Sequence, residues 1–148
     1  MGMPEEHPGY LPTMAHLTWP RSAALGVLAS LTLLAGCAQS AESSAGRVAE
    51  EFLQAVESGD GDTACGRLSP ATRKELEQSS GESCAQAVLA EDIQGGSTVD
   101  VNVFDTMAQV KYDNDAIFLS HFDTGWLVTA AACKPVPGKP YDCSIKGS

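Results

Sequence analysis

Positive charge is scarce in this sequence. Nine lysines and arginines stand against nineteen aspartates and glutamates, which gives the 148-residue chain a formal net charge of −10 at pH 7. A nucleic-acid surface needs clustered lysine and arginine, and the sequence has no basic stripe, so nucleic acid is not an expected partner. Anionic lipid headgroups also repel an acidic body. Any attachment to a membrane must therefore come from something other than surface charge.

Motifs of common catalytic and cofactor sites are missing as well. The sequence contains no G-x-S-x-G, no H-E-x-x-H and no glycine-rich phosphate loop. It contains no C-x-x-C, and His121 is the only histidine after residue 37, so we expect neither a metal ion nor another cofactor. Asp113 and Asp115 lack the further ligands of a calcium loop and are interpreted as solvated turn residues.

A short apolar run near the N-terminus is typical of an export signal. Residues 23–35 carry no charge and follow Arg21. The run is shorter than the roughly 20 residues that a transmembrane helix needs. A basic residue, a short apolar stretch and small residues after it predict a signal peptide over residues 1–36. The acidic residues and prolines before Met14 do not suit such a signal, so translation is expected to start at Met14.

The sequence Leu34-Ala35-Gly36-Cys37 at the end of this segment resembles the lipobox of bacterial lipoproteins. The resemblance implies a diacylglycerol on Cys37, a mature chain that begins there, and a location at the extracytoplasmic face of the cell membrane. Two acyl chains anchor a protein stably where one does not. Residues 37–45 are then expected to form a flexible tether. The alternative is an ordinary secretory signal with an unmodified Cys37.

Lipidation of Cys37 also accounts for an odd number of cysteines. The sequence has five, at positions 37, 65, 84, 133 and 143, and an odd count in an exported protein needs an explanation. Assigning Cys37 to the lipid leaves four, which an oxidising compartment favours as disulfides. Four cysteines allow three pairings. We favour Cys65–Cys84 and Cys133–Cys143, because both close short local loops.

After residue 45 the sequence divides into a helical half and a strand half. Apolar residues repeat at helical spacing over residues 46–58, and shorter helical segments are predicted through residues 65–68, 70–78 and 84–89. Alternating apolar residues predict strands at 99–103, 108–112, 116–122 and 126–132. Helices followed by an antiparallel meander predict an α+β domain over residues 46–148, with N-terminal helices packed on one face of a curved antiparallel sheet.

Two segments of this domain resemble a known family. The stretch AEEFLQAVESGDGDTACGRLSPATRKEL, residues 49–76, looks like the opening of NTF2-like domains, the cone-shaped fold of ketosteroid isomerase and SnoaL-like enzymes. The stretch GWLVTAAACKPVPGKPYDCSIKG, residues 125–147, resembles the end of small actinobacterial lipoproteins of that shape. The resemblance implies an NTF2-like cone. It implies no function, because this fold serves many unrelated ones.

Two side chains are candidates for chemistry inside such a cone. His121 shares a strand face with Ile117 and Leu119 and would act as a general base if a carboxylate lay beside it. Tyr112 would donate a hydrogen bond to a developing oxyanion, as an acid does in ketosteroid isomerase. Both residue types are more often structural at such positions, so catalysis by the domain is not expected.

The sequence therefore predicts a non-catalytic module that binds a small apolar ligand or another envelope protein. One alternative is a small isomerase or dehydratase that uses His121 or Tyr112, and a second is a structural envelope subunit. A closed apolar cone would favour ligand binding, and a polar pair inside it would favour an enzyme. An exposed apolar patch on the open face of the sheet would favour a protein partner.

Overall fold

The computed structural model describes residues 24–138 and 140–147, with side chains described from Gln39 onward. Its elements, in chain order, are α1 (Ala24–Glu57), α2 (Gly61–Arg67), α3 (Pro70–Ser80), α4 (Cys84–Ala90), β1 (Thr98–Phe104), β2 (Met107–Tyr112), β3 (Ala116–Phe122), β4 (Gly125–Lys134) and β5 (Asp142–Lys146). The strands form one antiparallel sheet in the order β1-β2-β3-β4-β5. The predicted α+β class is confirmed, with a sheet that is open at β1 and β5.

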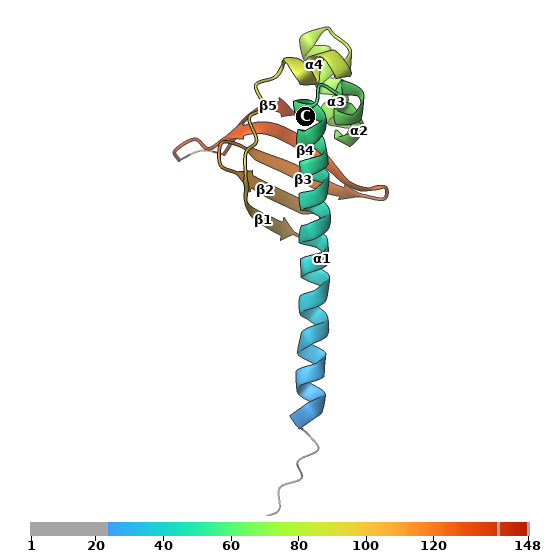
Figure 1. The fold of residues 1–148 in the computed structure, drawn as a ribbon, viewed down its shortest axis with the longest axis vertical. Coiled ribbons are helices and arrows are strands. Elements are labelled where there is room, and N and C mark those ends of the chain that lie inside the picture. The colour runs from blue at the N-terminus through green and yellow to red at the C-terminus, as the bar shows by residue number, and fades with distance from the viewer. Residues whose placement is uncertain (1–23, 139, 148) are drawn as a thin grey trace, which may run out of the picture.

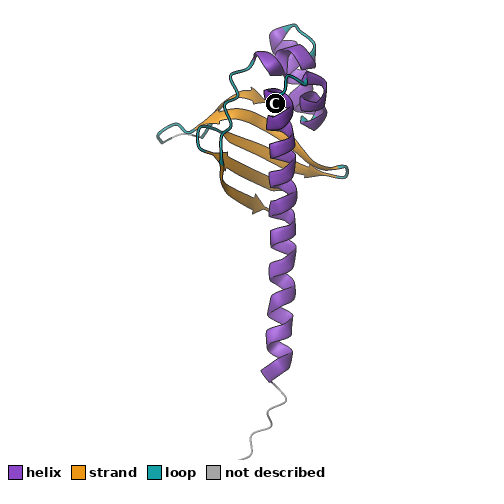
Figure 2. Ribbon diagram, viewed as in Figure 1, coloured by secondary structure: helices purple, strands orange, loops and turns teal. Residues whose placement is uncertain are grey.

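The helices pack on one face of this sheet. Helix α1 crosses the sheet and extends beyond it, while α2, α3 and α4 are gathered near the other end of α1 (Figures 1 and 2). Six apolar side chains of α1 are almost completely buried, namely Ala45, Val48, Ala49, Phe52, Leu53 and Ala55. Gly59 ends the helix, as predicted, with a φ of +74° that a glycine adopts without strain.

Helix α1 is longer at its N-terminal end than the sequence pattern predicts. It runs without a break through residues 37–45, which were expected to be an irregular tether. The reason is local, because this stretch contains no glycine or proline and is rich in alanine. The hydroxyls of Ser43 and Ser44 donate to the Ser40 carbonyl at 3.1 and 2.7 Å and so add to the helix's own bonds.

The predicted export signal lies mostly outside the described part of the chain. Residues 1–23 are not described, and neither are the side chains of residues 24–38, which include Cys37. Among the residues that are described, no helix combines the length and the apolar character of a membrane-spanning segment. The signal peptide over residues 1–36 and the lipid on Cys37 therefore stay predictions.

Side-chain caps set the starts of α2 and α3. The Asp60 carboxylate accepts from the backbone N–H of Thr63 at 3.0 Å, and the Ser69 hydroxyl accepts from that of Thr72 at 3.2 Å. Pro70 occupies the first turn of α3, as its fixed φ favours. The backbone N–H of Ser69 also donates to the Val128 carbonyl at 2.8 Å, which ties the connection between these helices to β4.

The sheet contains the four predicted strands and a fifth, β5, that was not predicted. Its apolar alternation is limited to Cys143 and Ile145, which is too little for a pattern of period two. The strand forms because Ile145 pairs with Ala131 and Cys143 pairs with Cys133 across β4. Tertiary pairing rather than local sequence thus completes the sheet.

Both favoured disulfides are present in the structure. Cys65–Cys84 joins α2 to α4, and Cys133–Cys143 joins β4 to β5. The two bonds close loops with sequence separations of 19 and 10 residues. Helices α2 and α4 have seven residues each, which is too short to be stable alone in water, so the first bond holds them to one another.

Removing the helical disulfide is expected to destabilise the domain. In the chain-entropy model, the Cys65→Ala/Cys84→Ala variant loses about 3 kcal/mol of unfolding free energy in urea denaturation. The Cys133→Ala/Cys143→Ala variant should lose slightly less, because its loop is shorter. Unchanged stability in both variants, or four free thiols in the oxidised parent, would contradict this assignment.

Candidate functional site

Side chains fill the space between the helices and the sheet. Phe52 from α1, Leu68 from the α2–α3 connection, and Ile117 and Leu119 from β3 are all fully or almost fully buried there. Val128 from β4 completes this central cluster. Of these five side chains, only Leu68 lines one of the hollows described below, and those hollows open at the surface. The core of the described residues therefore favours close packing over an interior that holds a ligand.

His121 lies at the exposed end of β3. It follows Ile117 and Leu119 on the alternation of the strand, as predicted, but the helices no longer cover this end of the sheet. Its ring packs edge-on against the indole of Trp126, with centroids 5.0 Å apart. No ion pair among the described residues includes His121. The structure therefore gives this histidine an aromatic neighbour but no carboxylate to make it a general base.

Tyr112 lies at the end of β2 and is buried, with 6 % of its surface exposed. Its hydroxyl makes no hydrogen bond of standard geometry among the described residues, although the Thr98 hydroxyl acts on it as a weak partner. Burial, and then the negative charge of Glu50, raise the pKa of Tyr112 to about 12, against the smaller effect of Thr98. The phenol is thus protonated at neutral pH. It borders a surface groove between α1 and the start of β1, not an interior cavity.

Asp115 is a second buried polar residue, and the sequence did not single it out. Its Oδ1 accepts from the backbone N–H of Ala116 at 2.7 Å, whereas its Oδ2 makes no hydrogen bond of standard geometry among the described residues, although the backbone N–H groups of Cys133 and Gln94 act on the carboxyl. Burial raises the pKa of this carboxyl, against the effect of nearby backbone N–H groups and Lys134. The expected solvated turn is wrong at this position, because the side chain folds inward at the β2–β3 turn and is only 6 % exposed.

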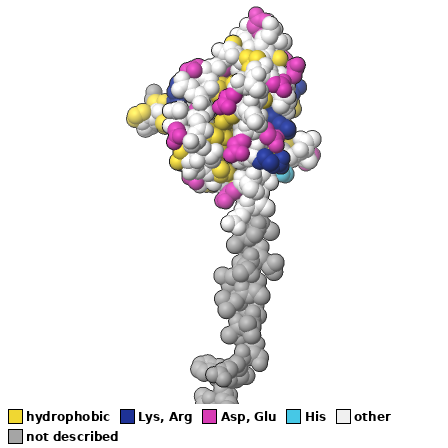
Figure 3. Space-filling model, viewed as in Figure 1, with side chains coloured by type: hydrophobic (Ala, Val, Ile, Leu, Met, Phe, Trp, Pro, Cys, Tyr) yellow, Lys and Arg dark blue, Asp and Glu magenta, His cyan; other side chains and the backbone are white. Residues whose placement is uncertain are grey.

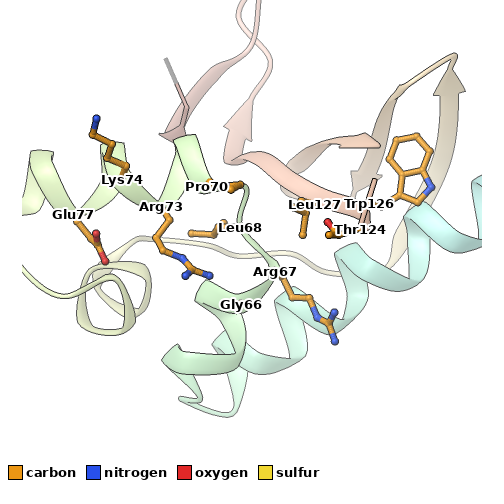
Figure 4. A pocket seen from close by; sticks show the side chains of 10 residues that line it. All are labelled: Gly66, Arg67, Leu68, Pro70, Arg73, Lys74, Glu77, Thr124, Trp126 and Leu127. Atoms are coloured by element: carbon orange, nitrogen blue, oxygen red, sulfur yellow. The ribbon is translucent and has the colours of Figure 1, made fainter. Parts of the chain in front are cut away.

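A hollow of about 600 Å³ lies beside the start of α3 (Figure 4). Its lining includes three of the chain's few cations, Arg67, Arg73 and Lys74. Two of these are already engaged, since Arg73 donates to the Cys65 carbonyl at 2.6 Å and Arg67 pairs with Glu51 at 2.9 Å. The side chain of Lys74 points away from both arginines in Figure 4. The three charges do not converge on one ligand position.

The outer face of the sheet carries large apolar side chains at one end. Phe104, Met107 and Phe122 are 63 %, 56 % and 40 % exposed. Phe104 pairs with Met107 across β1 and β2, and Met107 pairs with Ser120, two residues before Phe122, so the three share a face. We call these three residues the apolar corner. Further along this face, Tyr141 packs edge-on against Phe118 with centroids 5.2 Å apart.

Comparisons with known proteins do not assign the chain to a family. No family model, no curated protein and no solved structure matches it. Within the described residues, no group of three or more histidine, cysteine, aspartate or glutamate side chains is placed to hold a metal ion. The interpretation of this site therefore rests on its own geometry.

The buried carboxyl of Asp115 makes a testable prediction about pH. Because its pKa is raised in the folded state, the folded protein holds this proton more tightly than the unfolded chain does. Stability attributable to Asp115 should therefore fall as the pH rises from about 4, the ordinary value for aspartate, through the raised pKa. The Asp115→Asn variant, measured by urea denaturation between pH 4 and 7, should lack this decline.

Asp123→Asn is the matched control, since Asp123 lies in an exposed turn. The control should follow the pH dependence of the parent. An Asp115→Asn variant with the same pH dependence as the parent would show that this carboxyl is not protonated preferentially in the folded state.

Proposed function

We propose that the protein is a lipoprotein, anchored by a diacylglycerol on Cys37 at the extracytoplasmic face of the cell membrane. The domain that follows is a non-catalytic interaction module whose partner is another envelope protein. Residues 1–36 act as the signal peptide and are removed before the mature protein reaches the membrane.

The observation that carries the proposal is the pairing of the cysteines. The two disulfides use Cys65, Cys84, Cys133 and Cys143, so no other cysteine of the same chain is left for Cys37. Disulfides are typical of proteins outside the cytoplasm, which agrees with an export signal. Removal of residues 1–36 takes away Glu5, Glu6 and Arg21, so the remaining body has a formal charge of −9. Such a body gains nothing from anionic lipids, so two acyl chains supply the membrane affinity that its surface lacks.

The apolar corner supports a protein partner over a small apolar ligand or an enzyme substrate. Burying exposed apolar surface is favourable at about 25 cal/mol per Å², and large aromatic and methionine side chains are enriched at protein interfaces. The filled core offers a ligand no interior site, and His121 has no paired carboxylate among the described residues. These features favour recognition on the outer face of the sheet.

An NTF2-like arrangement of the domain belongs to the same proposal. Support comes from the order of elements, a long helix and three short ones before an antiparallel meander. The register shifts between β3 and β4, together with the positive φ of Ala132, +53°, are the kind of irregularity that bends a sheet into a cone.

Replacing the predicted lipid-bearing residue tests the anchor. In a bacterium that acylates lipoproteins, the parent should fractionate with membranes, and its mass should report loss of residues 1–36 and gain of a diacylglycerol. The Cys37→Ser variant should gain no diacylglycerol and should not be cleaved before residue 37, so its mass should still include the signal peptide. The Cys133→Ala/Cys143→Ala variant, which keeps Cys37, should stay acylated. Unchanged processing and fractionation of Cys37→Ser would overturn the proposal.

Site-specific crosslinking tests the interaction module. A photoreactive residue at position 107, within the apolar corner, should give one discrete adduct with an envelope protein in intact cells. The same residue at position 77, which is exposed on α3, is the control and should not give that adduct. No adduct at position 107, or identical adducts at both positions, would argue against a partner at this corner.

A further inference from the structure

A groove of about 440 Å³ separates the last turns of α1 from the start of β1. Its walls are formed by Glu50, Leu53, Gln54 and Glu57 on the helix side, and by Gly96, Thr98 and Tyr112 on the sheet side. We call it the Tyr112 groove. It is distinct from the apolar corner, and none of its residues takes part in the predicted membrane anchor.

The Tyr112 groove carries a net negative charge. Two of its side chains are carboxylates, Glu50 and Glu57, and no lysine or arginine lines it. The ion pairs among the described residues involve Glu51 and Asp92 instead, so neither groove glutamate is neutralised by a salt bridge. The C-terminal end of α1 adds partial negative charge here, and its last turn has no basic residue. On the face seen in Figure 3, acidic side chains are widely spread.

The hydroxyl of Tyr112 is the second indication of a ligand. The residue is only 6 % exposed, and its hydroxyl is one of two buried side-chain atoms that make no hydrogen bond of standard geometry among the described residues. A buried polar atom that is so poorly bonded is unfavourable, and such atoms are rare in native proteins. The Thr98 hydroxyl acts on it only as a weak hydrogen-bond partner and Glu50 acts through its charge, and both residues line the groove. The hydroxyl is therefore directed toward the groove side of the core.

One weak contact closes the groove over this hydroxyl. Thr98 Oγ1 donates to Glu50 Oε1 at 3.4 Å, which is long for a hydrogen bond between oxygens. A charged ammonium is a stronger donor to a carboxylate than a hydroxyl is. An ammonium that replaces the Thr98 hydroxyl at Glu50 would also give the Tyr112 oxygen a donor.

The spacing of the two carboxylates defines the shape of the ligand. Glu50 and Glu57 are seven residues apart, so they lie on the same side of α1 about 10 Å apart along its axis. One metal ion cannot bridge that distance, and the described residues hold no cluster of three metal-binding side chains. The apolar Leu53 and the amide Gln54 lie between the two carboxylates. We propose that the Tyr112 groove binds a linear aliphatic polyamine, with one ammonium at Glu50 and Tyr112 and another at Glu57.

Calorimetric titration with spermidine, a linear triamine, tests this inference on the full chain purified in detergent. At low salt and pH 7 we expect saturable binding of one spermidine per chain. Glu50→Gln and Glu57→Gln should each weaken binding about fivefold, as expected for one exposed ion pair. Butylamine, which has one ammonium, should bind at least tenfold more weakly than spermidine. Absence of saturable binding to the parent would overturn the inference.

Two further variants separate specific binding from general attraction to an acidic protein. Glu77→Gln removes an exposed carboxylate outside the groove and should leave the affinity unchanged. A loss as large as that of Glu50→Gln would show that spermidine is only a counterion. Tyr112→Phe keeps the ring and removes the hydroxyl, so the melting temperature without ligand should hold or rise while spermidine affinity falls about threefold. A lower melting temperature with unchanged affinity would show that the hydroxyl has a structural partner and no ligand.

Discussion

Helix α1 contacts four of the five strands, β1, β2, β3 and β4, whereas α3 contacts β4 and β5. One apolar helix face, centred on Phe52, therefore covers most strands of the sheet on this side. The remaining helices are short, and they hold their places through the Cys65–Cys84 bond and the hydrogen bond from Ser69 to Val128. The groove beside Tyr112 borders this contact, whereas the apolar corner lies on the opposite face of the sheet.

Much of the fold could be predicted because its signals are local. Gly59, Asp60, Ser69 and Pro70 each set a helix boundary through their own backbone preferences, and the structure places them at those boundaries. Helix α4 is an exception at its start. Ser79 and Glu82 have the spacing of a capping box, which would predict a helix start at Ser79. The box does not form, because the Ser79 hydroxyl donates to the Leu76 carbonyl and α3 continues to Ser80.

The less predictable features depend on contacts between distant residues. Strand β5 exists because β4 offers it an edge, and its own five residues carry almost no pattern. Asp115 stands in a stretch, Asp113-Asn114-Asp115, whose composition indicates only a turn. Whether Asp113 or Asp115 is buried depends on the segments of the protein that pack against this turn. The sequence did single out Tyr112, but as a hydrogen-bond donor to an oxyanion inside a cone. Its surroundings could not be predicted, because the alternation of a strand cannot show that a groove lies between α1 and this residue.

The unbroken course of α1 through residues 37–45 bears on the geometry of the proposed lipid anchor. A flexible string of nine residues would let the domain move toward or away from residue 37 freely. A helix of the same residues is a rigid spacer about 12 Å long, so the distance between residue 37 and the domain is fixed. With acyl chains on Cys37, the domain would pivot about this residue as one body with the helix. The apolar corner would then reach only partners at the radius that the spacer sets.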